Sequence, residues 1–586
     1  MIDTDNPAAL RSGKFDAGCD AITEFLRDAL GAVSHLSPDE LKVYGDAGHR
    51  FLQGWEFACD FDGAPIGIRV LVDQDFPFSA PRIGLAEPGS IDGAHIETGS
   101  LFCLPQGQTV AWDRPADALA VLLRQANDII AKALNPETER EETRREFIAY
   151  WVRDNAGSLA TSYIAPTGRS HKIFRIDDGT RSIRLFDNRA DAQSFFQTGG
   201  KKLRPIQFGK PAYLVWLRRP PAMNEIPATI GDLVRLLLQD PIEGLDELTA
   251  LVSKDRLTLI LGLSDSDGHG FFGVELPKLT FQHDAPVKLP FVSARDRDQM
   301  LTRLRVRRAD PEWVFGRDGN PHVTALRAAR VALIGAGSLG SYLAQQLASA
   351  GVGTITIVDP EVLVFENTSR HILGAEAVGA PKAEALALRL QRQFRTSIIT
   401  GTNARWQDWV ETARDDLGDY DLILCSIGDW PQEVHLADFF QNNRTDSALL
   451  YAWLEPHAVA SQAVILLGTS PCFCCGFDTK AEAARRMSDW DAATRRAVPL
   501  CGGQYQPYGA GALSGHAAAI AEFALRHLTG DIDGPAHLLR SAGDPAALGG
   551  RWQDWWIEEC GGGDLNYRSR VLPWPKRDNC PMCGGV

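Results

Sequence analysis

The feature that most constrains the fold is a glycine-rich turn between two apolar segments, in the stretch RVALIGAGSLGSYLAQQLASAGVGTITIVDP that begins at Arg330. The first apolar run has the length of a buried strand, and Gly335, Gly337 and Gly340 follow it in a GxGxxG pattern. A helical segment and a second apolar run then lead to Asp359. Such a strand–turn–helix–strand unit opens a doubly wound parallel sheet, so we expect a Rossmann-like domain here.

The residues of this unit predict a nucleotide site. Glycines let the backbone approach a phosphate closely, a helix start offers free N–H groups, and Asp359 can accept hydrogen bonds from ribose hydroxyls. The pattern alone is equally compatible with binding of a nucleoside triphosphate and binding of a dinucleotide. An NAD-linked oxidoreductase therefore stays open as an alternative to an ATP-using enzyme.

An amide and two cations follow the turn and favour ATP. Asn367 and Arg370 lie in the segment ENTSRH, and Lys382 lies in GAPKAEA. Cleavage of the bond between the α- and β-phosphates builds charge on oxygens that fixed cations stabilise, whereas hydride transfer has no evident use for such cations. We therefore expect Arg370 and Lys382 to act in catalysis on ATP, together with Mg²⁺.

From about position 308 to its end, the chain resembles the ThiF, MoeB and ubiquitin-activating adenylyltransferase family. GAGSLGS, the aspartate that ends the second strand, ENTSRH and GAPKAEA occur in that family's order and spacing. The resemblance implies that Asp359 holds the ribose and that Asn367, Arg370 and Lys382 contact phosphates. The family usually has glutamine directly after the arginine, where this chain has His371.

Two further expectations come from the same resemblance. The family uses an aspartate near Mg²⁺ at the end of a later strand, and Asp429 in DLILCSIGDW is the nearest carboxylate here. It also uses an arginine upstream of the first strand to reach the ATP of a partner subunit. Arg308 and Arg317 are both candidates for that role. A homodimer is therefore expected.

Seven of the eleven cysteines lie in the C-terminal fifth of the chain. Cys472 and Cys475 form one CxxC pair, and Cys580 and Cys583 form another. Four thiolates from two tight turns fit tetrahedral Zn²⁺ in a closed structural site. ThiF- and MoeB-like proteins carry the same arrangement, which supports zinc. Cys474 lies between two of these ligands and is expected to be a bystander.

A further cysteine is a candidate nucleophile. Cys501 lies in PLCGGQYQPYGAGAL, a glycine-rich segment ahead of a helical run. Its polar neighbours fit an accessible thiol, whereas Cys425, on an apolar strand, fits a buried one. In the adenylyltransferase family a cysteine between the metal pairs attacks the acyl adenylate, so the resemblance implies this role for Cys501. Cys560, in IEECGGGDL, stays open as the alternative.

The N-terminal part carries another thiol, Cys103. FPFSAPRIGL, then HIETGSLFCLPQG, then Trp112 and a long helical pattern from Pro115 to Ala133 follow one another. In this order the segments resemble a ubiquitin-conjugating domain over roughly the first quarter of the chain, with Cys103 as the thioester cysteine. His95 stands where the family's His-Pro-Asn motif begins.

The asparagine of that motif is absent. Neither Pro nor Asn follows His95 directly, and no asparagine lies between Asn6 and Asn127. The usual donor to the oxyanion is therefore missing, or another group supplies it. A nucleophilic thiol must still be exposed and partly ionised.

The length of 586 residues exceeds what one core supports. We expect an α/β multidomain protein with domains at 1–155, 156–304 and 305–586. These are a ubiquitin-conjugating-like α+β fold, a central small α/β linker or docking domain, and a doubly wound Rossmann-like ThiF adenylation domain. The central domain is predicted from strands at 212–217 and 257–263 with a helix at 230–238 between them.

Composition limits the partners. A formal charge of -15 argues against broad binding to nucleic acid or to an anionic membrane. The N-terminus lacks the pattern of a secretory signal, and no apolar run is long enough to span a bilayer. We therefore expect a cytoplasmic protein.

Both ends resemble successive enzymes of one pathway, and together they resemble bacterial activating–conjugating fusion proteins, as in CBASS anti-phage operons. The resemblance implies ATP-dependent activation of a protein C-terminal carboxylate, thioester transfer from Cys501 to Cys103, and conjugation to an amine, with lysine as the expected acceptor. The implied partner is the C-terminus of a cGAS/DncV-like nucleotidyltransferase. A ThiF/MoeB-like sulfur-carrier adenylyltransferase and an NAD-linked oxidoreductase are the alternatives.

Overall fold

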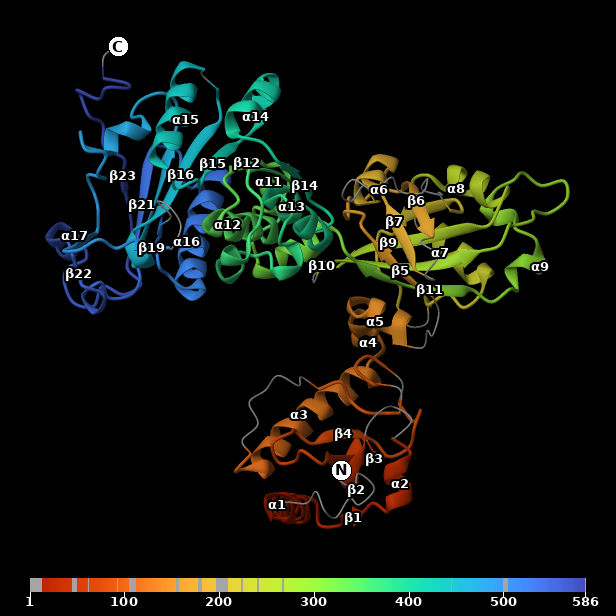
Figure 1. Ribbon diagram of the computed structural model, residues 1–586. Coiled ribbons are helices and arrows are strands. Elements are labelled where there is room, and N and C mark those ends of the chain that lie inside the picture. Colours follow the sequence, from red (N-terminus) through yellow and green to blue (C-terminus); the bar gives the residue numbers. More distant parts are fainter. Residues whose placement is uncertain are drawn as a thin grey trace. The chain divides into compact units, whose positions relative to one another are not determined.

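The computed structural model, drawn in Figure 1, forms two compact units, each described by itself below. One unit contains residues up to 162, with 166–185 and 208–308, and the other contains residues from 309 onward with 163–165 and 186–207. The described residues are 13–44, 50–61, 63–91, 93–97, 99–104, 112–153, 158–177, 182–196, 209–222, 225–239, 242–265, 268–443, 445–498 and 504–584.

The first unit opens with an antiparallel four-stranded sheet in the order β1-β2-β3-β4. Its strands are β1 (Ser34–His35), β2 (Phe51–Phe61), β3 (Ala64–Asp73) and β4 (Arg82–Leu85). The helices of this part are α1 (Gly13–Leu30), α2 (Pro38–Lys42), α3 (Pro115–Leu134), α4 (Pro136–Arg145) and α5 (Phe147–Arg153). Apolar residues of α1, α3 and the sheet form one core, because each helix turns one apolar stripe toward the strands.

The rest of this unit is built around a closed barrel in the strand order β10-β11-β5-β7-β6-β8-β9. Its elements are β5 (Leu159–Ser162), β6 (His171–Asp177), β7 (Ile183–Phe186), β8 (Ala212–Trp216), α7 (Ile230–Gln239), α8 (Leu245–Val252), β9 (Leu257–Asp265), β10 (Gly268–Leu276), α9 (Ala294–Arg297) and β11 (Thr302–Arg308). The helix α6 (Arg189–Phe196), which follows β7 in the chain, belongs to the second unit. The predicted β–α–β unit is present, since β8 and β9 are parallel with α7 between them. It is one part of a larger barrel that also contains β5, β6, β7, β10 and β11.

The barrel core includes side chains from α5. Phe147 and Trp151 pack there, and the Trp151 ring N–H donates to the Leu304 carbonyl at 3.0 Å. α5 precedes the boundary expected at residue 155, and β11 runs past the one expected at 304.

The second unit contains an eight-stranded sheet in the order β14-β13-β12-β15-β16-β17-β21-β23. The strands are β12 (Arg330–Ile334), β13 (Thr354–Val358), β14 (Ile398–Thr402), β15 (Leu422–Cys425), β16 (Ala448–Leu454), β17 (Ala460–Leu466), β21 (Ala536–Ser541) and β23 (Ser569–Pro573). The first five strands in this order are parallel, and β17, β21 and β23 continue antiparallel. The predicted strand–turn–helix–strand unit is confirmed as β12, α12 (Ser338–Ser349) and β13.

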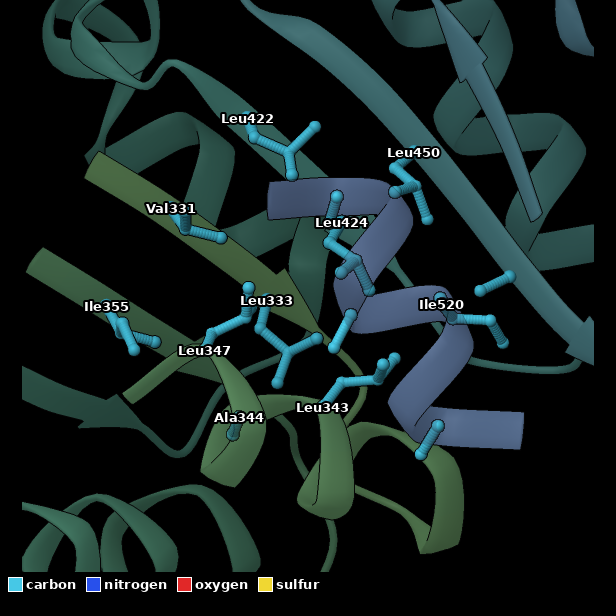
Figure 2. Close-up of a cluster of buried hydrophobic side chains, with 14 of the residues drawn as sticks. Val331, Leu333, Leu343, Ala344, Leu347, Ile355, Leu422, Leu424, Leu450 and Ile520 are labelled. Atoms are coloured by element: carbon cyan, nitrogen blue, oxygen red, sulfur yellow. The ribbon is translucent and has the colours of Figure 1, made fainter. Parts of the chain in front are cut away.

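Helices and loops cover both faces of this sheet. Val331 and Leu333 of β12 face one core with α12 and α16 (Ala510–Leu528), as Figure 2 shows, whereas Ala332 and Ile334 face the opposite core. Burial on both faces explains why the strand is apolar without alternation. The remaining elements are α10 (Pro311–Phe315), α11 (Val323–Ala328), α13 (Lys382–Gln393), α14 (Trp406–Thr412), α15 (Trp430–Asn442), β18 (Ser488–Trp490), β19 (Arg496–Ala497), β20 (Gln504–Tyr505), β22 (Gly550–Trp552) and α17 (Asp554–Glu559).

None of the helices in the described part of the chain combines the length and the apolarity that crossing a membrane requires.

Candidate functional site

The glycine turn between β12 and α12 depends on glycine at two positions. Gly335 has a φ of +95°, and a Cβ there would lie 3.0 Å from the backbone of Ser426. A Cβ on Gly340 would lie 1.9 Å from the Gly335 carbonyl oxygen. Around Gly337 there is open space for a ligand to approach.

Four of the predicted nucleotide-binding residues meet in one small cavity beside this turn. Gly337, Asn367, Arg370 and Lys382 line a volume of about 70 Å³. Ser338 and His371 complete the lining. The two cations therefore converge on the glycine turn from separate segments of the chain.

Lys382 and Asp359 are both buried next to this cavity. Nζ of Lys382 lies 2.5 Å from a carboxylate oxygen of Glu361, and its side chain is 6% exposed. Asp359 accepts the N–H groups of Ala336 at 2.7 Å and Glu361 at 2.8 Å. Burial raises the pKa of the Asp359 carboxyl, and these N–H groups and Lys382 act against that rise. The lysine is thus held in place before any ligand binds.

The His371 ring contacts the backbone of the glycine turn. Its Nε2 lies 2.7 Å from the Ala336 carbonyl oxygen, and its Nδ1 accepts the Leu373 N–H at 3.0 Å. Nε2 therefore carries the proton and donates to the turn. Burial lowers the pKa of this imidazole, so the ring is neutral.

Arg370 connects the cavity to the segment that follows β20. Its Nη1 donates to the Gln506 carbonyl at 2.9 Å, and its guanidinium lies 4.7 Å from the centre of the Tyr508 ring. The Tyr508 hydroxyl is 2.7 Å from the Ser338 hydroxyl. β19 pairs with β20, and between these strands the chain carries Cys501, which lies outside the described residues. The residues directly after β20, Gln506 and Tyr508, therefore contact the lining of the nucleotide cavity.

A larger cavity of about 580 Å³ adjoins the small one and shares Gly337 and Ser338 with it. Buried Glu433 lines this cavity and accepts the Gly428 N–H at 2.9 Å. Burial, reinforced by the charge of Asp429, raises the pKa of Glu433 to about 7. Asp429 itself is exposed, and its carboxylate caps α15 by accepting the Gln432 N–H at 3.1 Å.

The four cysteines predicted as metal ligands lie together. The Sγ atoms of Cys472, Cys475, Cys580 and Cys583 all lie within 4.8 Å of one another. The closest pairs are Cys475 with Cys583 at 3.3 Å and Cys472 with Cys580 at 3.5 Å. Four converging thiols, three of them buried, fit a closed tetrahedral Zn²⁺ site. Cys474 is buried beside them and is not part of this group.

The remaining candidates from residue 308 onward lie elsewhere. Arg317 stacks on the Trp313 ring at 3.9 Å, and Cys560 is half-buried at the end of α17. Arg308, at the end of β11, donates to the His269 carbonyl at 2.9 Å. Cys425 is buried on β15, as expected.

Cys103 is exposed at the edge of the four-stranded sheet. Its N–H donates to the His95 carbonyl at 2.8 Å. The His95 ring contacts two carboxylates, Glu142 at 3.2 Å from Nε2 and Glu146 at 3.2 Å from Nδ1. Burial is the largest influence on the Cys103 thiol and raises its pKa, although the side chain stays accessible.

Two family models match the parts of the chain that contain these residues. Residues 313–531 match the model of the ThiF family, and residues 39–159 match that of prokaryotic E2 family B. The chain is therefore an enzyme in which a prokaryotic E2-family domain is fused to a ThiF-family adenylation domain.

Particular relatives share both parts. The chain is 28% identical over 489 residues to the ATP-dependent ubiquitin transferase-like protein Cap2 of Pseudomonas aeruginosa, covering 79% of this chain and 85% of that protein. It is 23% identical over 554 residues to the protein of the same name from Escherichia coli, covering 83% and 85%. The E. coli molybdopterin-synthase adenylyltransferase is 38% identical over 101 residues, which are 17% of this chain and 40% of that one.

Several residues of the nucleotide site carry no strong signal in the sequence. Glu361, Ser338 and Tyr508 lie beside the predicted cations only because the chain folds back on itself. Ser338 could have been suspected from its place inside the GxGxxG pattern. Tyr508 lies 138 residues after Arg370, so no local pattern relates the two.

Proposed function

We propose that the chain activates the C-terminal carboxylate of a protein with ATP and Mg²⁺ and conjugates it to an amine. The acyl group passes from AMP to Cys501, from Cys501 to Cys103, and from Cys103 to the amine of a target lysine. The observation that carries this proposal is the convergence of Arg370 and Lys382 on the glycine turn. The Cap2 proteins, named as ubiquitin transferase-like, support it.

Adenylation joins the carboxylate to the α-phosphate. A carboxylate oxygen attacks that phosphorus, a P–O bond forms, and pyrophosphate leaves. Arg370 and Lys382 stabilise the charge on the phosphoryl oxygens, and Asp359 holds the ribose. Mg²⁺ neutralises phosphate charge, with Asp429 as the nearest predicted carboxylate. The larger cavity adjoins the turn and would receive the last residues of the substrate.

The thioester steps conserve the activation in a reactive acyl bond. The Cys501 thiolate attacks the acyl adenylate and AMP leaves; the Cys103 thiolate then displaces Cys501. The contacts of Arg370 with Gln506 and of Ser338 with Tyr508 support a role for Cys501, because they hold residues five and seven positions after it at the nucleotide cavity. Cys560 is the alternative nucleophile.

The activated partner is proposed from the chain's resemblance to bacterial activating–conjugating fusion proteins. We infer that the activated carboxylate is the C-terminus of a cGAS/DncV-like nucleotidyltransferase in a CBASS anti-phage operon. Zn²⁺ held by the four cysteines would anchor the C-terminal residues to the ThiF-type domain. A homodimer, in which Arg308 or Arg317 reaches the partner's ATP, completes the proposal.

The test combines the purified chain with ATP, Mg²⁺ and the nucleotidyltransferase of a neighbouring gene. Pyrophosphate exchange reports adenylation, and non-reducing gels with peptide mapping report thiol-labile adducts. We expect Cys103→Ala to accumulate the adduct on Cys501 and Cys501→Ala to form none.

Three other outcomes would contradict the proposal. Conjugation by Cys103→Ala would remove that thiol from the pathway. Pyrophosphate exchange without formation of a thioester adduct would favour a sulfur-carrier adenylyltransferase. Reduction of NAD without exchange would favour an oxidoreductase.

A further inference from the structure

The strands beside Cys103 bring a cation directly opposite the thiol. Residues 100–102 pair antiparallel with β4, since Leu85 N–H donates to the Ser100 carbonyl and Phe102 N–H donates to the Ile83 carbonyl, both at 2.8 Å. Gly84 and Leu101 form a bridge within this pairing. The same register sets Arg82 opposite Cys103.

Burial confirms which side the two side chains occupy. Ile83 and Phe102, an opposed pair, both belong to the core under the sheet. Successive residues of a strand point to opposite faces, so Arg82 and Cys103 share the other face. Directly opposed side chains on one face have Cβ atoms about 5 Å apart. The guanidinium of Arg82 is therefore within reach of a group bound to the Cys103 sulfur.

Glu97 holds Arg82 in this position. Both carboxylate oxygens of Glu97 accept from Nη2 of Arg82, at 3.1 and 3.0 Å, and the Arg82 side chain is only 16% exposed. Within the described residues, the buried Nε of Arg82 has no hydrogen-bond acceptor. Donor capacity thus remains on a cation that is already oriented.

The other donors near Cys103 are engaged. The Cys103 N–H donates to the His95 carbonyl. Both ring nitrogens of His95 face carboxylates, those of Glu142 and Glu146. The ubiquitin-conjugating resemblance leads one to expect an asparagine here, and the sequence has none between Asn6 and Asn127. Arg82 is therefore an oriented cation opposite the thiol, and its Nε is unpaired among the described residues.

We propose that Arg82 stabilises the oxyanion formed on the Cys103 thioester, with Glu97 as the residue that positions it. This inference rests on the proposed function, because it needs an acyl group on Cys103. The amine nitrogen attacks the thioester carbonyl, a C–N bond forms, and the carbonyl electron pair moves to oxygen beside Arg82. Collapse breaks the C–S bond, so the amide and the Cys103 thiolate result. The thiolate takes up the proton that the amine releases.

The test measures discharge separately from loading. Cys103 is loaded with ATP and the nucleotidyltransferase, ATP is removed with apyrase, and lysine is added. Arg82→Gln should load fully but discharge about 10²-fold more slowly, the usual effect of removing one oxyanion donor. Arg82→Lys should recover part of the rate, and Arg124→Gln, on the exposed face of α3, should match the parent chain. Discharge of Arg82→Gln within about twofold of the parent chain would overturn the inference.

A second measurement distinguishes a direct effect of Arg82 on the Cys103 thiol from a purely structural role of Arg82. Glu97 and Glu146 raise the pKa of the Cys103 thiol, and Arg82 lowers it. The pH profile of iodoacetamide alkylation, followed on the Cys103 peptide, should therefore move upward in Arg82→Gln and downward in Glu97→Gln. Glu142 and His95 are unchanged in both variants. Shifts in the same direction, or none, would overturn the inference.

The two levels of proposal fail differently. If the parent chain never forms a thiol-labile adduct on Cys103, the proposed function fails and the assay never reaches Arg82. If the parent chain loads and discharges while Arg82→Gln behaves like it, only the role of Arg82 is wrong.

Discussion

At the scale of single residues, the nucleotide site depends on a lysine that is already paired. Lys382 is buried against Glu361, so its ammonium group loses little freedom when a phosphate arrives. A fixed cation stabilises the charge that develops during adenylation better than a mobile one, because it needs no reorganisation.

We predict that Lys382→Ala lowers pyrophosphate exchange by about 10²-fold or more, since a preorganised cation is lost at the reacting phosphates. The substitution also leaves the Glu361 carboxylate unpaired beside Asp359. Arg392→Ala, an exposed position on the same helix, is the control. Exchange by Lys382→Ala at the rate of the control would show that the lysine does not touch ATP.

At the scale of elements, the β19–β20 hairpin is tied to the glycine turn by Tyr508. The hydroxyl bonds Ser338 while the ring supports Arg370, so one side chain joins three segments of the nucleotide site.

Tyr508→Phe keeps the ring and removes one hydrogen bond, which contributes about 1 kcal/mol. We expect the KM for ATP in pyrophosphate exchange to rise about fivefold with kcat little changed. Tyr505→Phe, the same change in β20, should alter neither constant. An unchanged KM in Tyr508→Phe would show that the hydrogen bond between Tyr508 and Ser338 does not contribute to ATP binding.

Two buried histidines make the ThiF-type sheet sensitive to acid. Burial lowers the pKa of His516, on α16, to about 4 and that of His537, on β21, to about 3. Both rings are neutral in the folded chain, whereas the unfolded chain binds protons below a pH of about 6.5. The unfolded state therefore gains protons first, and the free energy of unfolding falls as the pH drops from 7 to 5.

Each of these histidines should cost about 2 kcal/mol of stability at pH 5 relative to pH 7. Urea unfolding of His537→Gln, followed by tryptophan fluorescence, should show a pH dependence smaller by that amount. His283→Gln, at a histidine that is 95% exposed, should keep the full dependence. An equal pH dependence in the two variants would mean that His537 titrates normally.

At the scale of the whole molecule, the four-cysteine site joins parts of the chain that are 108 residues apart. We predict one Zn²⁺ per chain, lost in Cys580→Ser and retained in Cys474→Ser. Loss of a cross-link of this span lowers the free energy of unfolding by about 4 kcal/mol through chain entropy. Elemental analysis and thermal unfolding measure both effects. A zinc content unaffected by Cys580→Ser would exclude this cysteine as a ligand.

Short-range features of this protein could be predicted from its sequence. β12, the turn at Gly335 and α12 follow one another as predicted, because a buried strand, a positive φ and a helix start each depend on residues close in the sequence. The two CxxC pairs and the exposed Cys103 were likewise visible as local patterns. The two family models match the N-terminal and C-terminal parts of the chain in which these patterns occur.

Only the tertiary structure decided how distant segments meet. The closed barrel was predicted as a small α/β unit, since strand closure depends on pairings such as β10 with β11 and β11 with β5 that no local pattern encodes. The placement of Arg82 opposite Cys103, and of Tyr508 beneath Arg370, follows from strand register and chain return. The sequence by itself thus determined which chemical groups are present and their local geometry. The packing of non-local elements determined which of those groups act on the same atoms.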